Sequence, residues 1–138
     1  MKIADRVLGA LLIVAALVTA YYWWSYFFGG GDVMVTNARW YTAFESSFPI
    51  ADGWLALCAL FAGYGFIIGW RYTAAFGLMA ASAIFYLAAM DITFDIENGM
   101  YALASSNDAM KFEIFINISC MTLGVWTLIA SWRRLQSA

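Results

Sequence analysis

Histidine is absent from the 138-residue chain, so the commonest general base and the commonest protein ligand for haem, zinc and non-haem iron are missing. We therefore expect no cofactor that depends on histidine. The only two cysteines, Cys58 and Cys120, lie inside apolar runs, which predicts neither a disulfide framework nor a CxxC redox motif. Charged residues make up 12% of the chain, about half the share in soluble proteins. Without a basic patch, nucleic-acid binding is not expected.

Apolar residues make up 64% of the chain and gather into four runs, each long enough to cross about 30 Å of hydrocarbon. The runs predict helices at about 7–28, 49–70, 72–95 and 107–134, with outer loops at 29–48 and 96–106. The first run continues through an aromatic segment at 21–28, which favours a retained helix over a cleaved signal peptide. The predicted fold is one all-α domain over 1–138, a polytopic membrane protein with four antiparallel transmembrane helices and the lipid bilayer as its solvent.

Local signals refine the helix ends. The only proline, Pro49, suits the first turn of the second membrane helix. Within the loop before it, Thr36 is placed to cap a short amphipathic helix in which aromatic residues recur at Trp40, Phe44 and Phe48. Before the last helix, Ser105 and Asp108 have the spacing of a capping box.

Basic residues predict the orientation of the chain in the membrane. The predicted side of the two termini and the tight turn near residue 71 carries five of them: Lys2, Arg6, Arg71, Arg133 and Arg134. The two outer loops and their flanks hold only Arg39 and Lys111, whereas most acids lie on that side. We expect a prokaryotic cytoplasmic membrane, with both termini in the cytoplasm.

The stretch 88–101 concentrates the acidic signal. Asp91, Asp95 and Asn98 stand at i, i+4 and i+7, so a continuing helix would carry them on one face. Small residues recur at helical spacing on the face of the third helix that carries Asp91. Similar lines of small residues share a face with Asp52 in the second helix and with Glu113 in the fourth. Small residues let membrane helices approach closely. The three lines therefore predict that these carboxylates meet at one depth.

The predicted site is an outward-facing acidic pocket inside the membrane, in which carboxyls are neutralised by protons or by a bound cation. Its predicted ligand-binding residues are Asp52, Asp91, Asp95, Asn98, Glu113, Asn117, Trp54 and Tyr101. The aromatic residues would contribute cation–π contacts at its mouth. The alternative is that the acids are merely solvated at the level of the lipid headgroups.

The function favoured by these residues is non-enzymatic binding of a cation or a cationic, amphiphilic small molecule. No motif specifies a metal or a reaction. Two alternatives stay open: an accessory subunit of a larger membrane complex or a homo-oligomer, in which the small-residue lines serve assembly, and a small proton- or cation-coupled transporter. Against transport, no acid lies near the middle of the predicted first helix or near the middle of the bilayer, where coupling sites usually lie.

Overall fold

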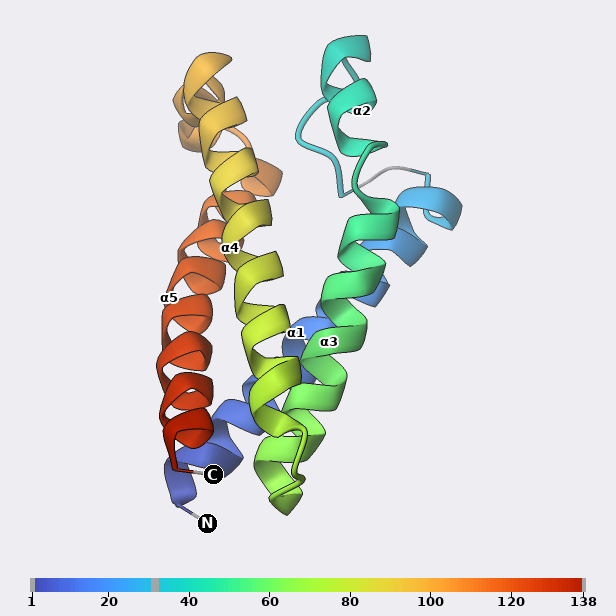
Figure 1. Ribbon diagram of the computed structural model, residues 1–138. Coiled ribbons are helices and arrows are strands. Elements are labelled where there is room, and N and C mark those ends of the chain that lie inside the picture. The colour runs from blue at the N-terminus through green and yellow to red at the C-terminus, as the bar shows by residue number, and fades with distance from the viewer. Residues whose placement is uncertain (1, 31–32, 138) are drawn as a thin grey trace.

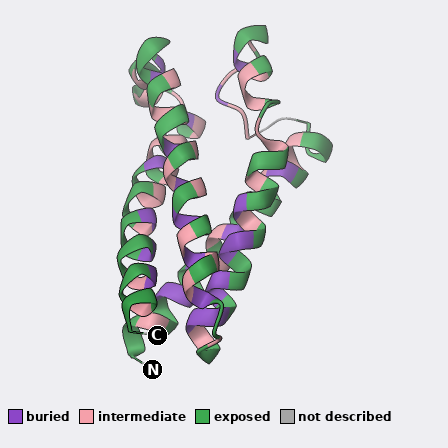
Figure 2. Cartoon of the chain, in the orientation of Figure 1, coloured by how far each residue is buried: buried purple, intermediate pink, exposed green. Residues whose placement is uncertain are grey.

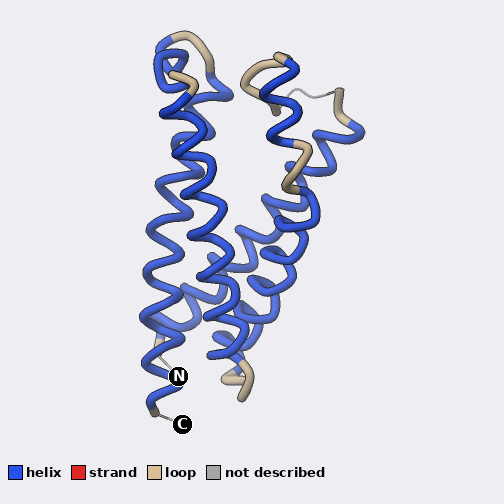
Figure 3. The backbone as a smooth tube through the Cα atoms, turned by 45° about the horizontal axis from the view of Figure 1, so that its top comes forward, coloured by secondary structure: helices blue, strands red, loops and turns tan. Residues whose placement is uncertain are grey.

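The computed structural model describes residues 2–30 and 33–137, and every regular element in these ranges is a helix (Figures 1 and 3). The long helices are α1 (Ile3–Phe28), α3 (Pro49–Ile68), α4 (Thr73–Glu97) and α5 (Asp108–Gln136). A short helix, α2 (Arg39–Glu45), precedes α3, and a 3-10 helix, η1 (Met100–Ser105), joins α4 to α5. A long helix is present at each of the four predicted positions, within four residues of the predicted bounds at each end.

The helix ends show where the local signals succeeded and failed. Pro49 is the first residue of α3, as predicted. The expected cap of α5 at Ser105 is wrong, because Ser105 ends η1 and the side chain of Asn107 accepts a hydrogen bond from the Met110 amide at 3.2 Å. Thr36 lies two residues before Ala38, the N-cap of α2, and its hydroxyl accepts from the Ala38 amide. Asn107, the residue immediately before α5, therefore caps this helix in place of the capping box predicted from Ser105 and Asp108.

Consecutive long helices pack on each other: α1 on α3, α3 on α4, and α4 on α5. Helices α1 and α3 approach closely where two glycines face each other, because a Cβ built on Gly63 would lie 2.6 Å from the Gly9 carbonyl oxygen. Such a contact requires glycine on both helices. The core between the helices is formed by small and branched side chains, among them Leu12, Ala59 and Ile84.

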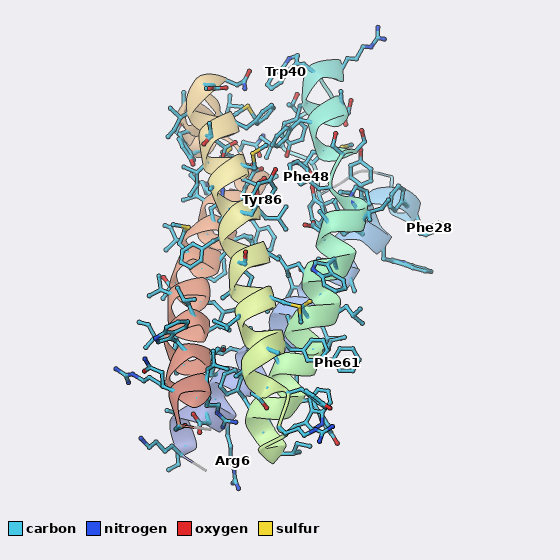
Figure 4. The ribbon with its side chains drawn as sticks, in the orientation of Figure 1. Arg6, Phe28, Trp40, Phe48, Phe61 and Tyr86 are labelled. Carbon is cyan, nitrogen blue, oxygen red and sulfur yellow. The ribbon has the colours of Figure 1, made fainter. Side chains whose placement is uncertain are left out.

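The outer faces of the long helices are exposed, and the buried residues form stripes that face the neighbouring helices (Figure 2). Many exposed residues are large and apolar, for example Leu17, Tyr86 and Ile118, which are 59%, 62% and 63% exposed. The side chain of Phe28 points away from the bundle (Figure 4). Four helical stretches are long and apolar enough to cross a membrane. Lipid is the solvent that suits such a surface.

Both chain ends and the α3–α4 turn lie at one end of the bundle, called here the terminal end, and α2 and η1 lie at the other, called the α2 end (Figure 1). At the terminal end, Arg134 of α5 binds the Asp5 carboxylate of α1 at 3.1 Å and stacks over the Phe66 ring of α3. Toward the α2 end, α1 diverges from α5 (Figure 1). The first and last helices are therefore joined mainly at the terminal end.

Candidate functional site

A cavity of about 190 Å³ lies between the helices toward the α2 end, and all five α-helices contribute to its lining. Among the described residues, those that line it with an acidic side chain come one from each of four helices: Glu45 from α2, Asp52 from α3, Asp91 from α4 and Glu113 from α5. None of the described lining residues is a lysine or an arginine. This acid-lined space is called the acidic cavity below.

Helix α1 supplies hydrogen-bond donors to two of the carboxylates. The Trp23 indole N–H donates to the Asp52 carboxylate at 2.7 Å, and the Tyr22 hydroxyl donates to the Glu45 carboxylate at 2.6 Å. Trp23 is buried, and Asp52 lies in the first turn of α3. The two bonds fix the carboxylates at the wall of the acidic cavity without neutralising their charge.

Helix α2 is too short to be stable alone, and aromatic packing holds it against α4. The Phe44 and Phe94 rings are stacked with centroids 3.8 Å apart and an interplanar angle of 6°. The Trp40 ring lies 5.7 Å from the same Phe94 ring, between α2 and the end of α4 (Figure 4). Because Glu45 is the last residue of α2, this packing also places its carboxylate in the cavity wall.

Helix α5 contributes a carboxylate and an amide one helical turn apart. The Glu113 carboxylate accepts a hydrogen bond from the buried Tyr41 hydroxyl at 3.2 Å. Asn117 lines the same cavity and is only 3% exposed, and its Nδ2 atom has no hydrogen-bond partner within the described ranges. A buried donor without a partner costs about 1–3 kcal/mol. The acidic cavity therefore contains an amide whose hydrogen-bonding capacity is unused.

Helix α4 carries two acids with different surroundings. Asp91 lines the cavity and lies within electrostatic range of Glu45, Asp52 and Asp95. Asp95 is fully buried outside the lining, and neither of its oxygens has a hydrogen-bond partner among residues 2–30 and 33–137. Burial, and then the nearby Asp95 carboxylate, raise the pKa of the Tyr101 hydroxyl on η1.

Of the eight residues predicted for the site, the structure brings four together on the acidic cavity: Asp52, Asp91, Glu113 and Asn117. The other four are not among the lining residues. Asn98 is exposed at the end of α4, where its side chain donates to the Phe94 carbonyl. Trp54 faces a separate shallow groove between α3 and α4. Tyr101 packs against the small apolar cluster around Met100 and Met110.

Three further residues at the site are not among the eight predicted from the sequence. Glu45 and Tyr22 line the cavity, and Tyr41 contacts one of its carboxylates. Glu45 follows the amphipathic pattern of α2, but nothing local shows that α2 packs on α4. Tyr22 belongs to an aromatic segment typical of the membrane interface, so its bond to Glu45 across 23 residues has no sequence signal.

The arrangement favours binding of positive charge. Four partly buried carboxylates face one space that has no basic group in its lining. Within the described part of the chain, no three acidic or cysteine side chains are close enough together to hold a metal ion. Apolar residues, including Val18, Leu87 and Ile116, form much of the remaining wall. The cavity thus combines charge with apolar surface.

Taken together, the geometry defines an all-helical protein with four helices suited to span a membrane and an acid-lined cavity between them. Comparisons with protein-family models, curated proteins and solved structures gave no match to this chain. Its function is therefore argued from the chemistry of the acidic cavity.

Proposed function

We propose that this is a non-enzymatic membrane protein whose acidic cavity binds a cation or a cationic, amphiphilic small molecule. One observation carries the proposal: four different helices each place one carboxylate on a single cavity, and no basic side chain lines it. Like charges that face one partly buried space repel each other more strongly than they would in water. A bound cation offsets this repulsion, because each carboxylate is attracted to it.

The orientation is part of the proposal. Helices α1, α3, α4 and α5 form an antiparallel bundle in a prokaryotic cytoplasmic membrane, with the terminal end in the cytoplasm. The excess of basic residues at the terminal end supports this orientation, because such residues are retained on the cytoplasmic side. The acidic cavity then opens toward the outer side, where cations arrive without crossing the bilayer.

The test is a thermal-shift screen of the purified protein with metal ions and with amines, at two pH values. A ligand that binds only the folded protein stabilises it by about 2.7 kcal/mol at a concentration 100 times its Kd. We expect at least one cation to raise the melting temperature. Asp91→Asn and Glu113→Gln should remove that increase, because each deletes one charge from the cavity wall.

The matched control is Asp108→Asn. Asp108 is 95% exposed, pairs with Lys111 outside the cavity and should keep the full ligand effect. If Asp91→Asn and Glu113→Gln respond to every cation as the unchanged protein does, the binding proposal is wrong. Constant copurification with a larger partner, together with instability alone, would favour an accessory subunit. Counterflow of labelled cations in liposomes would favour a transporter.

A further inference from the structure

The lining of the acidic cavity restricts the chemistry of its ligand, if the proposed binding function holds. The described residues offer no cluster that would hold a bare metal ion. They do offer apolar wall residues beside the carboxylates, such as Phe48, Leu87 and Ile116. An ammonium group attached to an apolar chain satisfies both kinds of surface, because the carboxylates accept its N–H bonds and the wall contacts its carbon atoms.

Asn117 points independently to a bound polar group. Its side chain is 97% buried in the cavity wall, since only 3% is exposed, and no hydrogen bond to the described residues holds Nδ2. Nδ2 is a donor and an ammonium group has no acceptor, so the amide serves this site in the orientation with Nδ2 and Oδ1 exchanged, in which the acceptor Oδ1 faces the cavity. An ammonium head next to Glu113, one helical turn away, would use this acceptor.

The cavity is too small for a long amphiphile. Its volume is about 190 Å³, below the roughly 300–1,000 Å³ of pockets that enclose drug-sized ligands. A head group and a few carbon atoms fit, and a chain of twelve or more carbons does not. Any long chain attached to the head must extend beyond the cavity, and its apolar carbon atoms favour a path between two helices into lipid over a path into water.

The wall between α1 and α5 is the exit that the fold provides. Both helices line the cavity, yet they pack on each other only slightly, and they diverge toward the α2 end (Figure 1). Val18 of α1 lines the cavity and is 39% exposed. Phe112 of α5 also lines the cavity and is 52% exposed. Each of the two helices thus contributes an exposed apolar side chain to the cavity wall.

We propose that the acidic cavity binds the ammonium head of a single-chain amphiphile that enters from the lipid between α1 and α5 and leaves its chain in the bilayer. The carboxylates neutralise the head, Asn117 accepts one of its N–H bonds, and Val18 and Phe112 flank the chain. A soluble short-chain amine uses the same head site with lower apparent affinity.

The test measures displacement of labelled butylammonium from the protein in phosphatidylcholine nanodiscs, with empty nanodiscs subtracted. The competitors are alkylammonium ions from four to sixteen carbons, and dodecanol is the uncharged control. We expect the displacing concentration to fall roughly tenfold for every two methylene groups, because each methylene transferred from water to lipid contributes about 0.8 kcal/mol and 1.4 kcal/mol is a factor of ten. Dodecanol should not displace the probe.

Val18→Trp tests the route of entry. The larger side chain should block the edge between α1 and α5, raising the displacing concentration of dodecylammonium at least tenfold while that of butylammonium changes by less than about twofold. Leu17→Trp is the matched control, because Leu17 is the neighbouring residue, is 59% exposed and does not line the cavity. It should behave like the unchanged protein.

The outcomes separate this inference from the proposed function. If butylammonium binds but chains of twelve carbons or more fail to displace it, the amphiphile proposal is wrong and cation binding stands. If Val18→Trp leaves dodecylammonium unaffected, the route between α1 and α5 is wrong. If neither the short nor the long amines bind, and metal ions do not bind either, the proposed function itself is refuted.

Discussion

Replacing Gly63 by alanine should push α1 and α3 apart. The added Cβ would lie 2.6 Å from the Gly9 carbonyl oxygen, about 0.8 Å short of the 3.4 Å at which ordinary contact begins, and 2.8 Å from Ile13 Cγ1. The first of these neighbours is backbone, so side-chain rotation cannot relieve the contact and the helices must separate. Overpacking of this kind costs about 1–3 kcal/mol.

Gly53→Ala is the matched control on the same helix. A Cβ at Gly53 would meet nothing within 4 Å, so alanine should instead stabilise α3 by up to about 1 kcal/mol through its higher helix propensity. The two identical substitutions should therefore change the free energy of unfolding in opposite directions. The assay is unfolding by SDS in mixed micelles, followed by circular dichroism.

The Gly63→Ala substitution should also affect ligand binding. Trp23 lies on α1 and bonds to Asp52 on α3, so separation of the two helices should also weaken this bond and reduce any amine-dependent stabilisation. If Gly63→Ala and Gly53→Ala stabilise the protein equally, the close approach at Gly9 and Gly63 does not hold α1 and α3 together as described.

Two further predictions concern residues around the acidic cavity. Asp95→Asn should raise the free energy of unfolding by about 1–3 kcal/mol, because it replaces a fully buried acidic side chain with a neutral amide of nearly the same shape; a loss of stability in the same SDS assay would show that the carboxyl group itself makes a stabilising contact in the folded protein. Phe44→Ala should speed hydrogen exchange of the α2 amides and weaken cation binding, because stacking on Phe94 holds Glu45 in place. Unchanged exchange would mean that α2 is anchored by other contacts.

The four long apolar helices were predictable because the requirements for crossing a membrane constrain a sequence strongly. A span needs about 20 apolar residues, and the four runs meet this length, so the helices fall where hydropathy places them. The exact ends depended on single polar side chains. For example, α1 begins at Ile3, with the Lys2 amide bonded to the Asp5 carboxylate, although the apolar run itself starts at residue 7.

The acidic cavity was predictable only in part. Small residues at helical spacing correctly traced the inner faces of α3, α4 and α5, and these faces carry Asp52, Asp91 and Glu113 to the cavity wall. Asp91 and Asp95 differ by about 40° around α4, because four residues exceed one helical turn. That rotation separates a cavity-lining acid from a fully buried one. Which acid faces which neighbour depends on how α4 packs on α5, and spacing alone does not encode it.

Ligand binding by these residues stays a prediction, and so do the single-domain organisation and the absence of a cofactor. The contribution of α2 needed tertiary information as well. Glu45 reaches the cavity only because Phe44 stacks on Phe94, which lies 50 positions further along the chain.

The order of helix packing has a consequence for biosynthesis. Consecutive long helices pack on each other, so each helix that leaves the ribosome after α1 finds one packing partner already made, and the bundle can grow in the order of synthesis. The bond between Arg134 and Asp5 is the exception, since it joins residues 129 positions apart. This contact can form only when translation of α5 is finished, and its formation marks the completed bundle.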